Sequence, residues 1–303
     1  MKILKFNIKT QKRFIAFLLV IVLFVTLFAN EQFDRTLAAA ESGNPKACYD
    51  VSLCYQYGYL DVEPNNEKAI YWAQKAADAG ISDADVDIGV YYLYFENNWE
   101  KASSHFEKAA KDKNAKGYYM LGLCYTNALS VPKDIKKGID NLKKASKLGF
   151  SQADYQLGML YYNSDDVKQD IKATFKYISK AAEGGIVEAQ SMLGSMYWQG
   201  FGTAEDKKKG YEWFEKAAEQ GNVHGMCVCA LELFAGELVE QDVERGFSYL
   251  YYAVQNGNAE EKAAALGELG FVYEQGLGVE VDDVKAQYYY SKQKELENKE
   301  NKL

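Results

Sequence analysis

The stretch that decides the fold is IVEAQSMLGSMYWQGFGTAEDKKKGYEWFEKAAEQG, residues 186–221. Over 187–199, apolar or small residues recur every three or four positions, which lines one face of a helix. Gly200 and Gly202 interrupt that pattern, because glycine readily adopts the positive φ that ends a helix and turns the chain. Asp206 can then cap a second helix, which has the same periodicity. The stretch therefore predicts a hairpin of two short helices.

The same pattern recurs along the chain. Its closing glycines are 36 residues apart, at Gly149, Gly185, Gly221 and Gly257. What we call the small-residue position of the first helix holds Ser52, Gly89, Gly122, Gly158, Gly194, Ala230 and Gly270. Three residues later, the tyrosine position holds Tyr55, Tyr92, Tyr125, Tyr161, Tyr197, Leu233 and Tyr273. Seven helix pairs in one register predict a stacked array, because a lone pair this short cannot bury its apolar face.

These positions carry a nameable motif. It comprises Ala189, Leu193, Gly194, Tyr197, Gly200, Gly202, Asp206, Gly210, Trp213, Lys216, Ala217, Ala218 and Gly221. The motif resembles the Sel1-like repeat, a relative of the tetratricopeptide repeat. The resemblance covers about Pro45 to Ser291 and implies an all-α fold. The implied architecture is a right-handed α-solenoid of about seven helix-turn-helix repeats.

Three repeats depart from the motif. The second, residues 81–113, has Glu96-Asn97-Asn98 in place of the glycine turn. The sixth has Leu233 at the tyrosine position, and the seventh lies 40 residues after the sixth instead of 36. These departures affect the expected local geometry and leave the expected fold unchanged.

The N-terminal region differs from the repeats. A basic stretch precedes an uncharged apolar run over residues 14–29, FIAFLLVIVLFVTLFA. Its basic residues are Lys2, Lys5, Lys9, Lys12 and Arg13. This pattern is typical of a targeting segment. We therefore expect a targeting segment over 1–40, the repeat solenoid over 41–290 and a charged C-terminal tail over 291–303.

The length of the apolar run leaves two kinds of targeting segment open. Its 16 residues slightly exceed a signal-peptide core of ~7–15 and fall just short of a membrane span of roughly 17–25. Ala38-Ala39-Ala40 offers a cleavage site but lies well beyond the run, so an uncleaved anchor is favoured. With the N-terminus inside by the positive-inside rule, the anchor places the repeats outside the cytoplasm. Cleavage would make the protein secreted or periplasmic.

Charge and cysteine content restrict the function further. The chain has 35 Lys/Arg and 43 Asp/Glu. The first 40 residues hold six of the Lys/Arg and two of the Asp/Glu, so residues 41–303 have a net charge of −12. An acidic body of this kind argues against a nucleic-acid partner. The five cysteines are an odd number without regular pairing, which favours buried thiols over a stray disulfide. They are Cys48, Cys54, Cys124, Cys227 and Cys229.

The sequence contains no convincing catalytic, metal or cofactor motif. His105 and His224 lie in different repeats without metal-ligand spacing, so we expect neither a metal nor a cofactor. Ser291 to Lys294 matches the penicillin-recognising S-x-x-K, but neither S-D-N nor K-T-G accompanies it. We therefore expect no enzymatic activity. A cysteine-rich Sel1-type protein that binds or hydrolyses β-lactams remains an alternative, as does one that binds cell-wall glycan.

A protein-binding scaffold is the expected function. Stacked helix pairs form a superhelix that binds ligands on its concave face, and the tetratricopeptide analogy implies that the first helices line this face. Aromatic and apolar side chains there would suit a protein or peptide partner. The predicted groove residues are Tyr119, Tyr155, Met159, Tyr162, Trp198 and Phe234.

Overall fold

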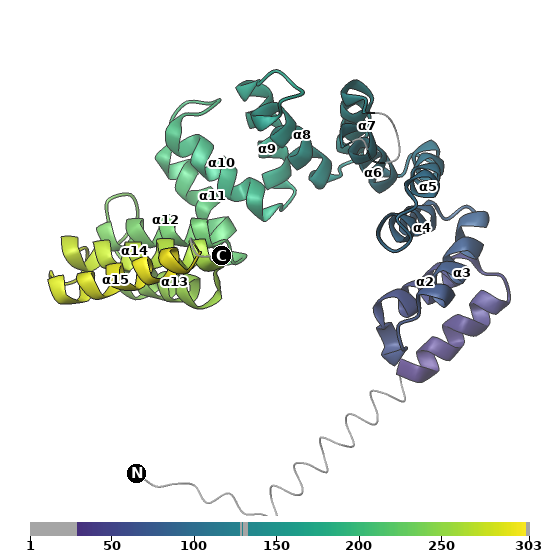
Figure 1. The fold of residues 1–303 in the computed structure, drawn as a ribbon, viewed down its shortest axis with the longest axis horizontal. Helices are drawn as coiled ribbons and strands as arrows, with labels where there is room; N and C mark the ends of the chain where they lie inside the picture. The colour runs from purple at the N-terminus through teal and green to yellow at the C-terminus, as the bar shows by residue number, and fades with distance from the viewer. Residues whose placement is uncertain (1–28, 128, 130–132, 301–303) are drawn as a thin grey trace, which may run out of the picture. The chain divides into compact units, whose positions relative to one another are not determined.

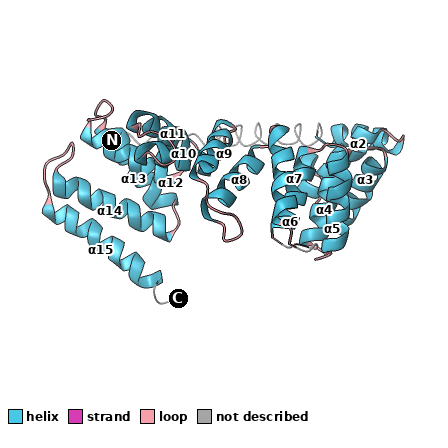
Figure 2. Ribbon diagram, turned by 90° about the horizontal axis from the view of Figure 1, so that it is seen from above, coloured by secondary structure: helices cyan, strands magenta, loops and turns pink. Residues whose placement is uncertain are grey.

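The computed structural model describes residues 29–127, 129 and 133–300. Within those ranges the regular structure is helical throughout, as Figure 2 shows. None of the described helices is both long enough and apolar enough to cross a membrane. The predicted targeting run lies outside the described residues, except for Ala29.

The helices follow one another in pairs, which Figure 1 labels along the chain. The first and second helices of the seven repeats are α2 (Pro45–Tyr57) and α3 (Asn66–Asp78), α4 (Ser82–Tyr94) and α5 (Trp99–Lys111), α6 (Ala115–Thr126) and α7 (Ile135–Lys147), α8 (Ser151–Asn163) and α9 (Ile171–Glu183), α10 (Val187–Gln199) and α11 (Lys207–Glu219), α12 (Val223–Ala235) and α13 (Val243–Asn256), and α14 (Ala259–Gln275) and α15 (Asp283–Glu300). A short 3-10 helix, η1 (Tyr59–Asp61), follows α2. The predicted all-α repeat fold is confirmed.

The second repeat forms its hairpin without the glycine turn. Asn97, between α4 and α5, adopts a φ of 48°, a left-handed conformation that asparagine tolerates better than most residues do. Asn98 then caps α5 by accepting a hydrogen bond from the backbone N–H of Lys101. Asparagine therefore replaces glycine here without loss of the helix pair.

The chain divides into two compact bodies. The N-terminal body ends at Ala145 and the C-terminal body begins at Ser146. Each body has its own buried apolar clusters, with Phe106 and Leu121 in the N-terminal one and Leu193 and Leu269 in the C-terminal one.

The small-residue position allows the two helices of a repeat to approach closely. A Cβ added at Gly89 would lie 2.5 Å from the Phe106 ring, and one added at Gly194 would lie 2.9 Å from the Phe214 ring. Phe106 and Phe214 are buried on the second helices of those repeats. The missing side chain therefore leaves room for a large apolar one on the facing helix.

The second helix of each repeat begins at a capping side chain. In all seven described repeats, the cap accepts a hydrogen bond of 2.9–3.1 Å from the backbone N–H three residues later. Its own backbone N–H donates to the carbonyl at the tyrosine position, at 2.8–3.0 Å. The caps are Asn65, Asn98, Asp134, Asp170, Asp206, Asp242 and Asp282. The first bond caps the second helix, and the second bond joins the two helices of a single repeat.

A lysine completes this turn in five repeats. The lysine three residues after the cap places Nζ over the ring at the tyrosine position, 4.7–5.6 Å from the centroid. The pairs are Lys68 with Tyr55, Lys101 with Tyr92, Lys137 with Tyr125, Lys209 with Tyr197 and Lys285 with Tyr273. We call the cap, the lysine and the tyrosine the turn clamp. Each cation–π contact of this kind contributes ~0.5–1 kcal/mol.

Packing extends beyond both expected boundaries of the solenoid. Residues 29–41 form a helix in which Phe33 meets Tyr55 edge-on at 5.7 Å, while Leu37 packs on the same cluster. At the other end, α15 continues into the expected tail as far as Glu300, and Leu296 packs against the last apolar cluster. The described fold therefore includes parts of both flanking segments.

The cysteines are buried free thiols. All five lack a disulfide. Burial raises the thiol pKa of Cys124 to about 11 and those of Cys227 and Cys229 to about 12. Because the thiolate is the reactive form, these side chains act as small apolar groups in the core.

Candidate binding surface on the first helices

Trp198 is a predicted groove residue that lines a hollow in the C-terminal body. Its ring meets Phe214 at an interplanar angle of 65°, with centroids 6.0 Å apart. The hollow measures about 110 Å³ and also has Val228 and His224 in its wall. Trp198 therefore contributes both to the packing of its own repeat and to an accessible surface.

The three predicted groove tyrosines are half-buried. Tyr119 packs beside the Phe106 cluster in the N-terminal body, and Tyr155 packs beside the Ile178 cluster in the C-terminal body. Burial raises the pKa of both phenols. Tyr162 meets Phe201 edge-on at 6.1 Å, and Met159 is also half-buried.

Phe234 requires a correction. Its side chain is 0% exposed, and its ring lies 4.9 Å from that of Phe247 on the second helix of the same repeat. A Cβ at Gly246 would lie 2.9 Å from the Phe234 ring, so the ring fills the space that this glycine leaves. Phe234 therefore belongs to the core and offers no surface to a partner.

An aromatic surface that sequence reasoning missed lies in the N-terminal body. Tyr57, Tyr59, Tyr94 and Phe95 are 55%, 55%, 71% and 64% exposed. The Tyr91 ring stacks on that of Phe95, with centroids 5.4 Å apart. We call these five residues, at the ends of α2 and α4 and in η1, the aromatic patch. The paired aromatics Tyr94-Phe95, directly before a turn, were the available sequence signal.

The patch borders a hollow between the first two repeats. The hollow measures about 180 Å³, and α2, α3 and α4 line it. Tyr57 and Phe95 stand in its wall together with Gln56 and Asp87. It therefore combines ring faces with a few polar groups, as ligand pockets commonly do.

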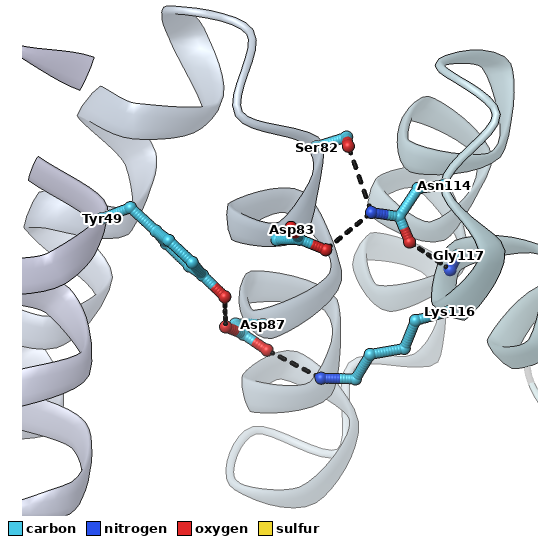
Figure 3. A network of polar contacts seen from close by, with 7 residues as sticks. All are labelled: Tyr49, Ser82, Asp83, Asp87, Asn114, Lys116 and Gly117. Carbon is cyan, nitrogen blue, oxygen red and sulfur yellow. Dashed lines mark hydrogen bonds and ion pairs between the residues drawn. The ribbon is translucent and has the colours of Figure 1, made fainter. Parts of the chain in front are cut away.

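A polar network ties the first helices of the N-terminal body together, as Figure 3 shows. The Tyr49 hydroxyl on α2 donates to Asp87 Oδ2 on α4 at 2.8 Å, and Lys116 Nζ on α6 lies 3.1 Å from Asp87 Oδ1. Burial and the neighbouring Asp87 raise the pKa of Tyr49, which keeps the hydroxyl as a donor. Asp87 is 8% exposed. Its contacts with Tyr49 and Lys116 offset the cost of burying the carboxylate.

A second link in Figure 3 holds α6 against α4. The Asn114 amide nitrogen donates to Ser82 Oγ at 3.1 Å and to Asp83 Oδ1 at 2.7 Å. Its amide oxygen caps α6 by accepting from the backbone N–H of Gly117. The network therefore has a structural role: it fixes the spacing of the helices beside the hollow.

A larger hollow opens between α12 and α14 in the C-terminal body. It measures about 400 Å³ and shares His224 and Val228 with the hollow at Trp198. Leu231 and Ala264 contribute apolar side chains to its wall. Glu268 on α14 contributes a carboxylate. Both hollows lie along the first helices, where the repeat analogy expected a ligand.

The other residues singled out in the sequence have ordinary structural surroundings in the parts of the chain that the structure describes. No group of three His, Cys, Asp or Glu residues there is placed to hold a metal ion. His105 Nδ1 lies 2.7 Å from buried Asp85. In the S-x-x-K match, the Ser291 hydroxyl donates to the backbone carbonyl of Tyr288, and both Ser291 and Lys294 are exposed on α15.

Comparisons with known proteins agree with this architecture. The family model described as Sel1 repeat matches residues 45–81, 115–150, 151–186, 187–222, 223–258 and 261–292. It passes over the second repeat, which nevertheless forms α4 and α5. A curated relative is the ERAD-associated E3 ubiquitin-protein ligase component HRD3B of Arabidopsis thaliana, 31% identical over 113 residues. That match covers 35% of this chain and 17% of the plant protein.

Two solved structures show the same fold. A protective antigen of uropathogenic Escherichia coli strains, which displays an SLR fold, matches with a TM-score of 0.73 and 26% identity. That match covers 87% of this chain and 56% of the antigen chain. A Sel1 repeat protein from Oxalobacter formigenes matches with a TM-score of 0.59 and 25% identity, over 77% of this chain and 98% of the other. This chain therefore spans only part of the plant protein and of the antigen.

Proposed function

Because the chain belongs to the Sel1 repeat family, we propose that it is a non-enzymatic scaffold that binds a protein or peptide partner along the first helices of its repeats. The aromatic patch is the observation that carries this proposal. Exposed clusters of large apolar side chains mark interaction sites, because they are costly to leave in water. Tyrosine and phenylalanine are also the side chains that contribute most where proteins meet.

The predicted groove residues extend this proposal to the C-terminal body. Tyr155, Met159, Tyr162 and Trp198 all retain partial exposure on first helices, so a bound polypeptide could contact them. Tyr119 has the same role in the N-terminal body. Each body is proposed to offer its own contact surface.

We also propose that the repeats act outside the cytoplasm, either anchored by the N-terminal segment or released from it. The basic residues ahead of the apolar run support this location. N-terminal sequencing of the mature protein tests it. A start at Met1 or Lys2 in a membrane fraction would favour the anchor, and a start near residue 41 would favour release. A full-length chain found only in the cytoplasm would contradict both.

Site-specific photocrosslinking on the full-length chain tests the binding surface. A benzoylphenylalanine in place of Tyr57 or Tyr94 reports on the aromatic patch. The matched control is Tyr71, which is 54% exposed but lies on the second helix α3. We expect one polypeptide to crosslink from Tyr57 and Tyr94 but not from Tyr71.

Replacing the same residues by alanine gives a second measurement. Tyr57→Ala and Tyr94→Ala should each weaken capture of the crosslinked polypeptide, whereas Tyr71→Ala should leave it unchanged. Equal crosslinking from all three positions, or from none of them, would count against the aromatic patch as the contact surface.

A further inference from the structure

The hollow between α12 and α14 has an unusual combination of walls. Apolar side chains of Val223, Val228 and Leu231 come from α12, and Ala264 comes from α14. The carboxylates of Glu260, Glu261 and Glu268 also line it, whereas its lining contains no lysine or arginine. The hollow is therefore apolar and negatively charged at once.

Glu268 is the most informative of the three acidic residues. It is half-buried, and no hydrogen bond or ion pair reaches its carboxylate from residues 133–300. Burial raises its pKa, as expected of a carboxylate that lacks compensating partners. A partly desolvated carboxylate in this state gains most from a cationic donor brought in by a ligand.

The other two carboxylates belong to the first turn of α14. Glu261 Oε2 accepts from the backbone N–H of Asn258 and so completes the cap of α14. Glu260 is exposed in the first turn of the same helix. They add negative potential to the lining of the hollow, and Glu261 is the one of the two that forms a structural hydrogen bond.

From this arrangement we propose that the hollow binds an arginine or lysine side chain of a polypeptide partner. The methylene stem of such a side chain would lie along Val228, Leu231 and Ala264, and its cationic head would meet Glu268. Basic side chains combine a long apolar stem with a charged tip, which matches both kinds of wall. This inference rests on the proposed function and specifies the chemistry of the partner.

Peptide display on the full-length chain tests this inference. A library of random dodecapeptides is selected against the wild type and against Glu268→Gln, which keeps the shape of the side chain and removes its charge. We expect selected peptides to share an arginine or lysine beside apolar residues, and this enrichment to disappear with Glu268→Gln. Glu280→Gln, which alters an exposed loop residue of the same body, should preserve it.

Two measurements then quantify the contact with one selected peptide. Fluorescence anisotropy should show binding weakened about tenfold or more when citrulline replaces a selected arginine, because the charge-assisted hydrogen bond to the carboxylate is lost. Ala264→Phe, which fills the hollow and leaves every carboxylate in place, should weaken binding similarly. Circular dichroism checks that Glu268→Gln and Ala264→Phe remain folded.

The possible outcomes separate this inference from the proposed function. Selected peptides without a basic residue, or binding insensitive to Glu268→Gln and Ala264→Phe, would overturn the inference and leave polypeptide binding intact. Failure to select any peptide would contradict the proposed function as well.

Discussion

At the scale of the residue, the tyrosine position is explained by the turn it holds. The backbone carbonyl of Tyr197 accepts from the cap Asp206, and its ring lies under Lys209 Nζ. The same ring meets that of Phe175, on the second helix of the preceding repeat, at 5.4 Å, so the tyrosines that mark the repeat in the sequence are committed to packing within the array. This commitment explains why the strongest sequence signal identifies the fold and does not identify the ligand surface.

Removing one cap tests the turn clamp. Asp206→Ala loses the hydrogen bond to the backbone N–H of Lys209 and should lower the free energy of unfolding by about 1 kcal/mol. Urea denaturation followed by circular dichroism measures the change. Glu205→Ala, at the neighbouring exposed residue, should change it by less than half as much. Equal effects would mean that the cap contributes nothing specific.

A buried carboxylate in the C-terminal body should make stability depend on pH. Burial raises the pKa of Asp154, although Ser146 donates a hydrogen bond to it and Lys180 lies 3.9 Å away. A raised pKa means that the folded chain binds the proton more tightly than the unfolded chain does. Protonation of Asp154 therefore stabilises the fold at low pH, and this contribution is lost as the pH rises.

The variant Asp154→Asn isolates this effect. Its stability relative to the wild type should increase between about pH 3 and pH 6, because the amide never ionises. Urea unfolding at several pH values measures the difference. An unchanged difference across that range would show that the lysine and serine fully compensate the buried charge. Asp165→Asn, at an exposed turn residue, is the control.

At the scale of the element, the helix over 29–41 is a part of the fold that the sequence did not predict. The charged and apolar pattern before residue 41 indicated a targeting segment, and periodicity within the repeats gave no reason to extend the fold upstream. Phe33 and Leu37 nevertheless cover the apolar side of the first repeat. A first repeat has no preceding neighbour, so a flanking helix buries the face that a neighbour would otherwise cover.

Removing the Phe33 side chain should destabilise the first repeat. Phe33→Ala removes a ring that meets Tyr55 at 5.7 Å and should cost about 2–4 kcal/mol, because the ring is only partly buried. Hydrogen exchange in α2 and α3 measures the loss. Gln32→Ala, exposed on the same helix, should leave exchange unchanged. Unaltered protection in both variants would show that this helix does not support the repeat.

Element boundaries and the fold class were accessible from the sequence because they depend on local chemistry. Glycine at 200 and the cap at Asp206 determine a hairpin within 36 residues. The binding surface was less accessible, because one register position is filled differently in different repeats. Trp198 is half-exposed at the position where Phe234 is buried, since each ring responds to the facing second helix.

At the scale of the whole molecule, repeats interact with their nearest neighbours, so damage should stay local. A Cβ at Gly225 would lie 2.7 Å from the backbone carbonyl of Phe214 in the preceding repeat. Gly225→Ala should therefore cost about 1–3 kcal/mol, as overpacking does. Hydrogen exchange should accelerate in α11 and α12 while α4 and α5 remain protected. Uniform acceleration through the chain would mean that the array unfolds as one cooperative block.

The turn clamp also affects how such a chain can evolve. Its cap, lysine and tyrosine all come from one stretch of 36 residues, so a duplicated stretch brings a complete set of them. Gene duplication or slippage could therefore change the copy number without redesigning any junction between the helices of a repeat. Selection would then act mainly on the side chains outside the clamp, which are free to diverge toward new ligands.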